Sequence, residues 1–190
     1  MSVPDTAVAA RHTAVPFVRA AVPADYPAIR EVVVAAYRQY AGLLERDIFS
    51  PYLADLLDVD THARFGHLFV VEAGERVCAY AAWYPDASVR WFPWPAGWAT
   101  GRALAVHPDA RGNGAAHALL AAGEHLALQA GAPVLAFHTH SYMTGAIALY
   151  ERLGYRRAPK FDVDLAARFG GPGAAPIMAF AYIRHLTRHT

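Results

Sequence analysis

Apolar and polar positions along this chain follow patterns that predict both strands and helices. Short apolar runs bounded by turn residues are typical of strands, and apolar positions spaced three and four apart are typical of helices. Strands are expected at residues 15–20, 68–72, 76–84, 98–106, 133–140, 155–163 and 177–185, and helices at residues 25–40, 52–57, 114–130 and 144–153. The early hairpin and the central strand–helix–strand unit indicate an α/β fold with a central sheet of mixed direction.

Turn residues separate the predicted helices and strands from one another, but no linker divides the chain into domains. Ser50 and Pro51 are expected to interrupt the chain before the second helix. Residues 15–190 are expected to form one domain, preceded by a flexible tail at residues 1–14. A chain of 190 residues with 55% hydrophobic residues can bury a sizeable core.

Composition and charge narrow the classes of partner. The formal net charge is +1 at pH 7, so no strong field would attract nucleic acid or an anionic membrane. Cys78 is the only cysteine, which excludes an internal disulfide and fits a reducing compartment. The sequence shows neither a signal-peptide pattern nor an apolar run long enough to cross a bilayer, so a cytoplasmic protein is expected.

The segment most informative about chemistry is Arg111-Gly112-Asn113-Gly114-Ala115-Ala116, between a predicted strand and an Ala- and Leu-rich helix. Small residues at such a turn leave backbone N–H groups uncovered, and the first N–H groups of a helix lack partners and favour anions. The segment therefore predicts a phosphate or pyrophosphate site. It lacks the Gly-Lys-Ser/Thr of a P-loop, and the next strand lacks the acidic residue of a dinucleotide-binding fold. A turn that only closes the strand–helix corner is the alternative.

A second segment, from Ala146 to Tyr155, reads Ala-Ile-Ala-Leu-Tyr-Glu-Arg-Leu-Gly-Tyr. Together the two segments resemble the GCN5-related N-acetyltransferase (GNAT) family. The first matches the family signature Arg/Gln-x-x-Gly-x-Gly/Ala at Arg111, Gly114 and Ala116. The second matches Ala-x-x-Leu-Tyr-Glu-x-Leu-Gly-Phe/Tyr at Ala146, Leu149, Tyr150, Glu151, Leu153, Gly154 and Tyr155. The resemblance implies the GNAT fold, in which helices flank a mixed central sheet.

The resemblance also implies that acetyl-CoA is the co-substrate. In the family, strand residues matching Leu104, Ala105 and Val106 pair by backbone with the pantetheine arm. The implied pyrophosphate contacts are the backbone N–H groups of Arg111, Gly112, Asn113, Gly114, Ala115, Ala116 and His117. Tyr150 matches the family's general acid, which protonates the departing CoA thiolate. The alternative role for Tyr150 is that of a half-buried aromatic residue on a helix face.

One position departs from the family pattern. Many members carry an asparagine seven residues before the tyrosine, where this chain has Met143. A thioether cannot make the hydrogen bond of an amide. A backbone group, Tyr142 or Ser141 could supply that contact instead.

The acceptor amine must lose a proton, and His138 lies where some family members place a carboxylate base. His138 and His140 share one face of the predicted strand, and histidine titrates near neutrality. The alternatives are a histidine that is packed in the core or lies beside the cofactor, with ordered water as the base. A metal site is not expected, because no acidic or cysteine ligand lies near these histidines in the sequence.

An aromatic run covers a predicted strand end and the loop after it. Its members are Trp83, Tyr84, Trp91, Phe92, Trp94 and Trp98. The run is interpreted as a hydrophobic lid or a homodimer contact. The alternative is an acceptor pocket that selects an apolar or aromatic amine.

These observations predict an N-acetyltransferase that moves the acetyl group of acetyl-CoA to a primary amine by direct attack in a ternary complex. A small-molecule acceptor is expected, because the sequence contains no strongly charged docking surface. One alternative is a non-catalytic module that binds or senses acyl-CoA. The other is an acyltransferase for a longer acyl chain, for which the small residues at 100–105 leave room.

Overall fold

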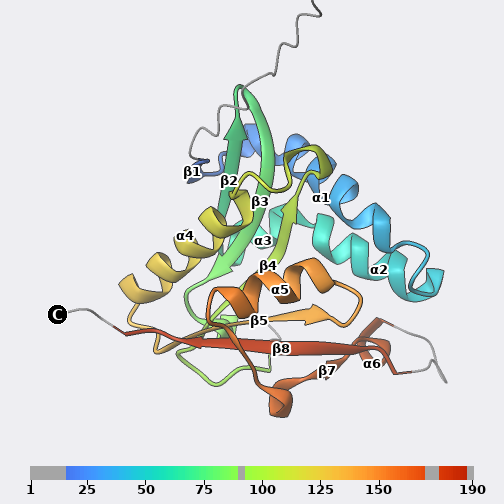
Figure 1. Cartoon of the computed structure of the whole chain (residues 1–190), viewed down its shortest axis with the longest axis vertical. Helices are drawn as coiled ribbons and strands as arrows, with labels where there is room; N and C mark the ends of the chain where they lie inside the picture. Colours follow the sequence, from blue (N-terminus) through green and yellow to red (C-terminus); the bar gives the residue numbers. More distant parts are fainter. Residues whose placement is uncertain (1–15, 90–92, 170–175, 188–190) are drawn as a thin grey trace, which may run out of the picture.

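The structure is a computed structural model, and it describes residues 16–89, 93–169 and 176–187. The tail expected at residues 1–14 lies outside the described residues. The strands, drawn in Figure 1, are β1 (Phe17–Ala20), β2 (His67–Ala73), β3 (Arg76–Tyr84), β4 (Ala99–Val106), β5 (Val134–His140), β6 (Arg156–Arg157), β7 (Val163–Asp164) and β8 (Met178–His185). The α-helices are α1 (Tyr26–Tyr37), α2 (Arg46–Leu57), α3 (Val59–Phe65), α4 (Ala115–Gln129), α5 (Thr144–Arg152) and α6 (Leu165–Phe169).

The described strands form one eight-stranded sheet in the order β1-β2-β3-β4-β5-β8-β6, with β7 also paired to β8. Every pairing is antiparallel except that of β4 with β5, which is parallel, so the predicted mixed sheet is confirmed. In the described part of the chain, β4 and β5 pair only through Ala99 with Leu135 and Thr100 with Ala136. The two strands separate after that point, and β5 and β8 lie across the direction of β2 and β3 (Figure 1).

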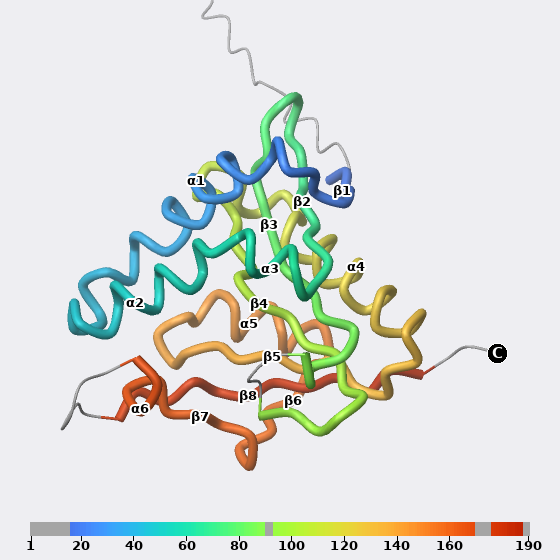
Figure 2. The backbone as a smooth tube through the Cα atoms, turned by 180° about the vertical axis from the view of Figure 1, so that it is seen from behind, coloured from blue at the N-terminus to red at the C-terminus, as the bar shows by residue number. Residues whose placement is uncertain are grey.

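Alternation along β3 divides the core into two layers. Tyr80 and Tyr84 lie in the apolar cluster that contains α1, whereas Ala81 and Trp83 lie in the cluster that contains α4. Successive side chains of a strand point to opposite faces, so α1 and α4 cover opposite faces of the sheet. Figure 2, from behind, shows the two helices on opposite sides of β3.

Trp83 occupies space that two glycines leave open. A Cβ atom on Gly101 of β4 would lie 2.1 Å from the indole ring, and one on Gly123 of α4 would lie 2.6 Å from it. Both distances are far below van der Waals contact. The indole therefore fixes the distance between α4 and the sheet, beside the point where β4 and β5 part.

A β-bulge bends β4 directly after Gly101. Ala82 pairs with Arg102 and Tyr80 pairs with Ala105, so β4 has one residue more than β3 between these pairs. Ala103 lies in the bulge with a φ of 56°, which is unusual for a residue with a side chain. Bulges of this kind turn a strand and redirect its side chains.

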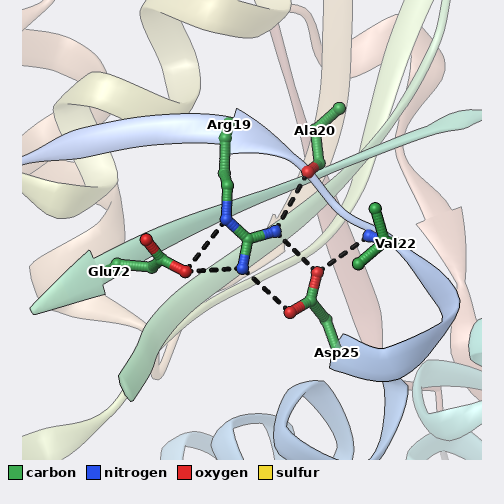
Figure 3. A network of polar contacts seen from close by, with 5 residues as sticks. All are labelled: Arg19, Ala20, Val22, Asp25 and Glu72. Carbon is green, nitrogen blue, oxygen red and sulfur yellow. Dashed lines mark hydrogen bonds and ion pairs between the residues drawn. The ribbon is translucent and has the colours of Figure 1, made fainter. Parts of the chain in front are cut away.

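Arg19 joins β1, β2 and the turn before α1 (Figure 3). Its Nε donates to Oε1 of Glu72 over 2.9 Å, and its two terminal nitrogens donate to the carboxylate of Asp25 over 2.7 and 2.9 Å. Asp25 also accepts from the backbone N–H of Val22 over 2.8 Å. The hydrogen bonds from Arg19 lower the pKa of Asp25, so the carboxylate is stabilised in its charged form.

Two predictions about elements were wrong, and helices α3 and α6 were not predicted. Pro51 does not interrupt the chain but lies inside α2, whose buried face of Ile48, Tyr52 and Leu56 offsets the missing N–H. Helix α3 was not predicted, although Asp58 caps it by accepting from the N–H of Thr61. The strand expected at 155–163 is split into β6 and β7 by a 3₁₀ turn at Pro159–Phe161, because proline cannot donate to a ladder.

Candidate active site

The separation of β4 from β5 opens into a cavity of about 400 Å³. Its walls come from β4 and β5, from the end of α1, from α2, and from the start of α5. The glycine turn before α4 reaches the same cavity through Arg111 and Ala116. The fold thus brings both sequence motifs, which lie far apart in the chain, to one cavity.

One backbone edge of β4 faces this cavity. Ala105 and Val106 pair with Tyr80 and Ala79 on the β3 side. On the other side the ladder to β5 ends at Thr100, and Leu104, Ala105 and Val106 line the cavity. An extended ligand placed there can pair with the strand in the way that a neighbouring strand would.

The glycine turn has the backbone geometry of an anion site. Gly112 and Gly114 have φ angles of 80° and 89°, a region that favours glycine, and α4 begins directly after them. No described atom lies within 4 Å of a Cβ atom placed on Gly112, so the turn is open on that side. The side-chain oxygen of Asn113 accepts from the N–H of Ala115 over 2.9 Å, which satisfies one donor of the helix start. His117, in the first turn of α4, is exposed and does not line the cavity.

Tyr150 projects from α5 into the cavity wall. Its ring packs against Phe137 of β5 with centroids 4.4 Å apart, and only 5% of the residue is exposed. Burial raises the pKa of the phenol well above its usual value, so the hydroxyl stays protonated at neutral pH. The position fits a proton donor, and it also meets the alternative expectation of a packed aromatic residue.

Met143 lines the cavity at the start of α5, where the family often has asparagine. Its sulfur accepts a hydrogen bond from the hydroxyl of Thr139 over 3.6 Å. Of the two proposed substitutes, Tyr142 lines the cavity and Ser141 is exposed outside it. Tyr142 therefore has the better position for a polar contact with a ligand.

His138 and His140 both line the cavity, as expected from their shared strand face. Nε2 of His138 is 2.8 Å from the carbonyl oxygen of Phe161, and the ring stacks on Trp94 with centroids 4.5 Å apart. Burial lowers the pKa of His138, so the ring is neutral near pH 7. This environment holds the ring firmly and commits one of its nitrogens to the protein backbone.

The aromatic run has two structural roles. Trp83 and Tyr84 are core residues, whereas Trp94 packs against Trp98 and Phe161 outside the cavity wall. Trp91 and Phe92 lie outside the described residues. Of the run, Trp83 also reaches the cavity wall, beside Phe137 and Tyr150. The remaining aromatic rings of the wall are tyrosines from outside the run: Tyr37, Tyr40, Tyr52 and Tyr142.

Sequence reasoning named Tyr142 as a possible ligand contact but missed Tyr37, Tyr40 and Tyr52, because the four tyrosines come from three separate segments. Only Tyr37 and Tyr40, spaced three apart near a helix end, share a local pattern. Tyr40 meets Tyr142 at 5.3 Å between centroids, and Tyr37 meets Tyr52 at 6.1 Å. Tertiary packing alone creates these pairs.

A buried ion pair completes the wall. Arg102 of β4 donates to the carboxylate of Asp55 on α2, and its guanidinium lies 6.0 Å from the centre of the Tyr52 ring. Arg102 lines the cavity, but within the described ranges no carboxylate does. Arg102 and Arg111 are therefore the permanently charged side chains in the described wall.

Comparison with known proteins decides the family. The model of the acetyltransferase (GNAT) family matches residues 28–155, which include the glycine turn and the Tyr150 helix. This chain belongs to the GNAT acetyltransferase family. None of the curated proteins is significantly similar to it in sequence.

Solved structures of GNAT proteins share this fold along most of their length. A protein from Corynebacterium glutamicum described as histone acetyltransferase HPA2 and related acetyltransferase superposes with a TM-score of 0.65 at 22% identity, over 93% of this chain and 99% of its own. The protein yncA from Salmonella typhimurium, solved with acetyl-CoA, gives a TM-score of 0.59 at 19% identity, over 92% of this chain and 96% of its own. The PaiA N-acetyltransferase from Thermoplasma acidophilum, solved with coenzyme A, gives 0.65 at 12% identity, over 90% and 98%. These likenesses confirm the GNAT fold.

The described part of this GNAT chain contains no helix long and apolar enough to span a membrane. Nor do its described residues include a group of three His, Cys, Asp or Glu side chains that could hold a metal ion.

Proposed function

We propose that this GNAT protein is an N-acetyltransferase that transfers the acetyl group of acetyl-CoA to the primary amine of a small molecule. The observation that carries this proposal is the meeting of three features at one cavity: an open edge of β4, the glycine turn, and Tyr150. A relative of the same fold from Salmonella typhimurium was solved with acetyl-CoA, which supports this choice of co-substrate.

The residues present fit a CoA ligand. Among the backbone N–H groups from Arg111 to His117, that of Arg111 donates to the Pro108 carbonyl and that of Ala115 to Asn113. The others hold the pyrophosphate at the start of α4, where two glycines with positive φ expose them. The edge of β4 from Leu104 to Val106 pairs with the amide groups of the pantetheine arm. When bound, acetyl-CoA supplies an activated thioester.

The remaining chemistry belongs to this chain and to the amine. The amine attacks directly in a ternary complex, and Tyr150 donates its hydroxyl proton to the departing sulfur. His138 is the residue that the sequence places as the base, and ordered water is the alternative. The cavity favours a small molecule over a protein chain, because its aromatic walls can pack around a compact acceptor.

The test is a measurement of free thiol released from acetyl-CoA in the presence of a panel of primary amines. We expect release that depends on the amine and saturates with it. Binding of acetyl-CoA without amine-dependent release from any member would instead support a non-catalytic acyl-CoA-binding module. Faster release from a longer acyl-CoA than from acetyl-CoA would support the alternative donor.

A further inference from the structure

His140, at the end of β5, carries an unusual ring nitrogen. The residue is 3% exposed and lines the cavity, and its Nδ1 is buried without a hydrogen-bond partner among the described residues. A backbone contact with Met178 on β8 raises the pKa of His140, and because Nδ1 has no partner we assign this contact to the other ring nitrogen. A contact with that effect has the imidazole donating to a carbonyl, so Nδ1 carries the lone pair.

An acceptor nitrogen in this position needs a donor. Buried polar atoms are nearly always hydrogen-bonded, and leaving one unsatisfied costs about 1–3 kcal/mol. The donor that fits an imidazole lone pair in the wall of an acetyltransferase cavity is the N–H of the acceptor amine. Neutral imidazole can also take the proton that this N–H carries.

Two aromatic rings hold His140 in place. Tyr142 stacks on it with centroids 5.1 Å apart at an interplanar angle of 10°, and Tyr52 meets it edge-on at 5.7 Å and 88°. These are the same tyrosines that surround the cavity. His138, in contrast, packs between Trp94 and the Phe161 carbonyl, which lie outside the ring of tyrosines.

We propose that His140, rather than His138, accepts the proton that the acceptor amine loses during acetyl transfer. The inference rests on the proposed function and names a residue for a step that the function leaves open. The amine nitrogen forms a bond to the acetyl carbon and gives one proton to Nδ1 of His140. The carbon–sulfur bond breaks, its electron pair stays on sulfur, and sulfur takes the proton of Tyr150. Solvent then removes the proton from His140 and restores that of Tyr150, which leaves an acetylated amine and free thiol.

The electrostatic surroundings keep this ring neutral. Burial is the largest effect on His140 and lowers its pKa to about 4, with smaller contributions in the same direction from Arg102 and from His138 once that ring is protonated. The other titratable groups that face it are the phenols of Tyr52 and Tyr142, which burial holds protonated. Asp55 pairs with Arg102, and Arg168 of α6 interacts with Arg102 in turn. The lone pair is therefore available at pH 7, and the proton moves as bond formation makes the nitrogen acidic.

The test compares His140→Gln, His138→Gln and His185→Gln in the thiol-release assay. Glutamine keeps an N–H donor for the Met178 backbone but cannot take a proton. We expect kcat/KM for the amine to fall by roughly 10²-fold or more in His140→Gln, the range of a lost general base, and by less in His138→Gln. His185, exposed at the opposite end of β8, is the matched control and should leave kcat/KM unchanged.

A pH profile separates a base from a packing residue. The ratio of parent to His140→Gln activity should stay constant near neutrality and shrink as the pH falls toward about 4, where His140 becomes protonated. A larger loss in His138→Gln, or a His140→Gln enzyme that matches the parent, would overturn the proposal. A parent that binds acetyl-CoA but releases no thiol would instead overturn the proposed function.

A measurement on the parent covers the case in which His140→Gln does not fold. The side-chain ¹⁵N resonances of histidine report hydrogen bonding at each ring nitrogen. Adding the best acceptor amine to the parent with bound CoA should shift Nδ1 of His140, assigned through variants of the other histidines. An Nδ1 resonance that does not move at a saturating amine concentration would contradict the proposal.

Discussion

At the scale of single residues, Tyr150 is the group on which the proposed reaction depends most. Tyr150→Phe removes one hydroxyl and keeps the ring against Phe137, so the packing of α5 should survive. We expect kcat to fall by at least about tenfold, toward the roughly 10²-fold typical of a lost general acid. The KM for acetyl-CoA should change little, because the hydroxyl acts mainly in the transition state.

Steady-state kinetics of Tyr150→Phe with acyl donors of different thiol acidity would check this. The defect should shrink for a more acidic thiol, which needs less help to leave. A variant that turns over ordinary acetyl-CoA at the parent rate would show that Tyr150 is only a packed aromatic residue.

The space around Trp83 gives a second prediction at this scale. Gly123→Ala places a methyl group 2.6 Å from the indole carbons, so the ring or α4 must move. Overpacking of this kind costs about 1–3 kcal/mol. Urea denaturation should therefore show a lower free energy of unfolding for Gly123→Ala.

Gly145→Ala is the matched control for that measurement. Gly145 is also helical, and no described atom lies within 4 Å of its Cβ position. Alanine should leave stability unchanged or raise it by up to about 1 kcal/mol through its higher helix propensity. Equal free energies of unfolding for the Gly123→Ala and Gly145→Ala proteins would mean that the Trp83 ring moves without loss of stability.

At the scale of elements, the glycine turn and α4 form the expected phosphate site. Gly114→Glu forces a side chain onto a φ of 89° and brings a carboxylate to a helix start that should hold a diphosphate. We expect isothermal titration to detect no binding of CoA. Gly74→Glu, in the β2–β3 hairpin at a φ of 65°, carries the same strain and charge away from the cavity and should bind CoA as the parent does.

The elements also show why sequence was sufficient for one part of the site and insufficient for another. The glycine turn and the α5 segment are contiguous motifs whose local geometry follows from their own residues, so sequence placed them correctly in the fold. Helix α2 was mistaken because Pro51 is tolerated there through burial against distant residues. The tyrosine wall depends on α1, α2 and the end of β5 meeting in space, which no local pattern encodes.

At the scale of the whole molecule, buried neutral histidines make stability depend on pH. The folded pKa of His140 is about 4, below the roughly 6.5 expected in the unfolded chain, and the folded pKa of His138 is lowered as well. The unfolded state therefore binds more protons in this window, and stability rises with pH there. The free energy of unfolding should fall as the pH decreases from about 6.5 toward 4.

Urea unfolding at a series of pH values would measure this dependence. His140→Gln should flatten the curve between these limits, because glutamine does not titrate. Asp25 adds a separate loss at lower pH: hydrogen bonds from Arg19 lower its pKa, so its contribution disappears only as the pH falls below the usual value of about 3.9 for an aspartate. A curve for His140→Gln that parallels the parent would mean that His140 is already protonated in the folded state.

The short parallel ladder between β4 and β5 has a consequence for how this protein assembles. Strands β1–β4 pair among themselves within the first part of the chain, and β5–β8 pair among themselves within the second. Each half is thus a unit of strand pairing, and among the described residues two rungs of the ladder join the two units, while both apolar clusters contain residues from each of them. The ligand site lies on neither unit alone and is created only when the two dock. A bound ligand that contacts both units stabilises the docked state. Its presence should therefore raise both the cooperativity of urea unfolding and the urea concentration at the midpoint.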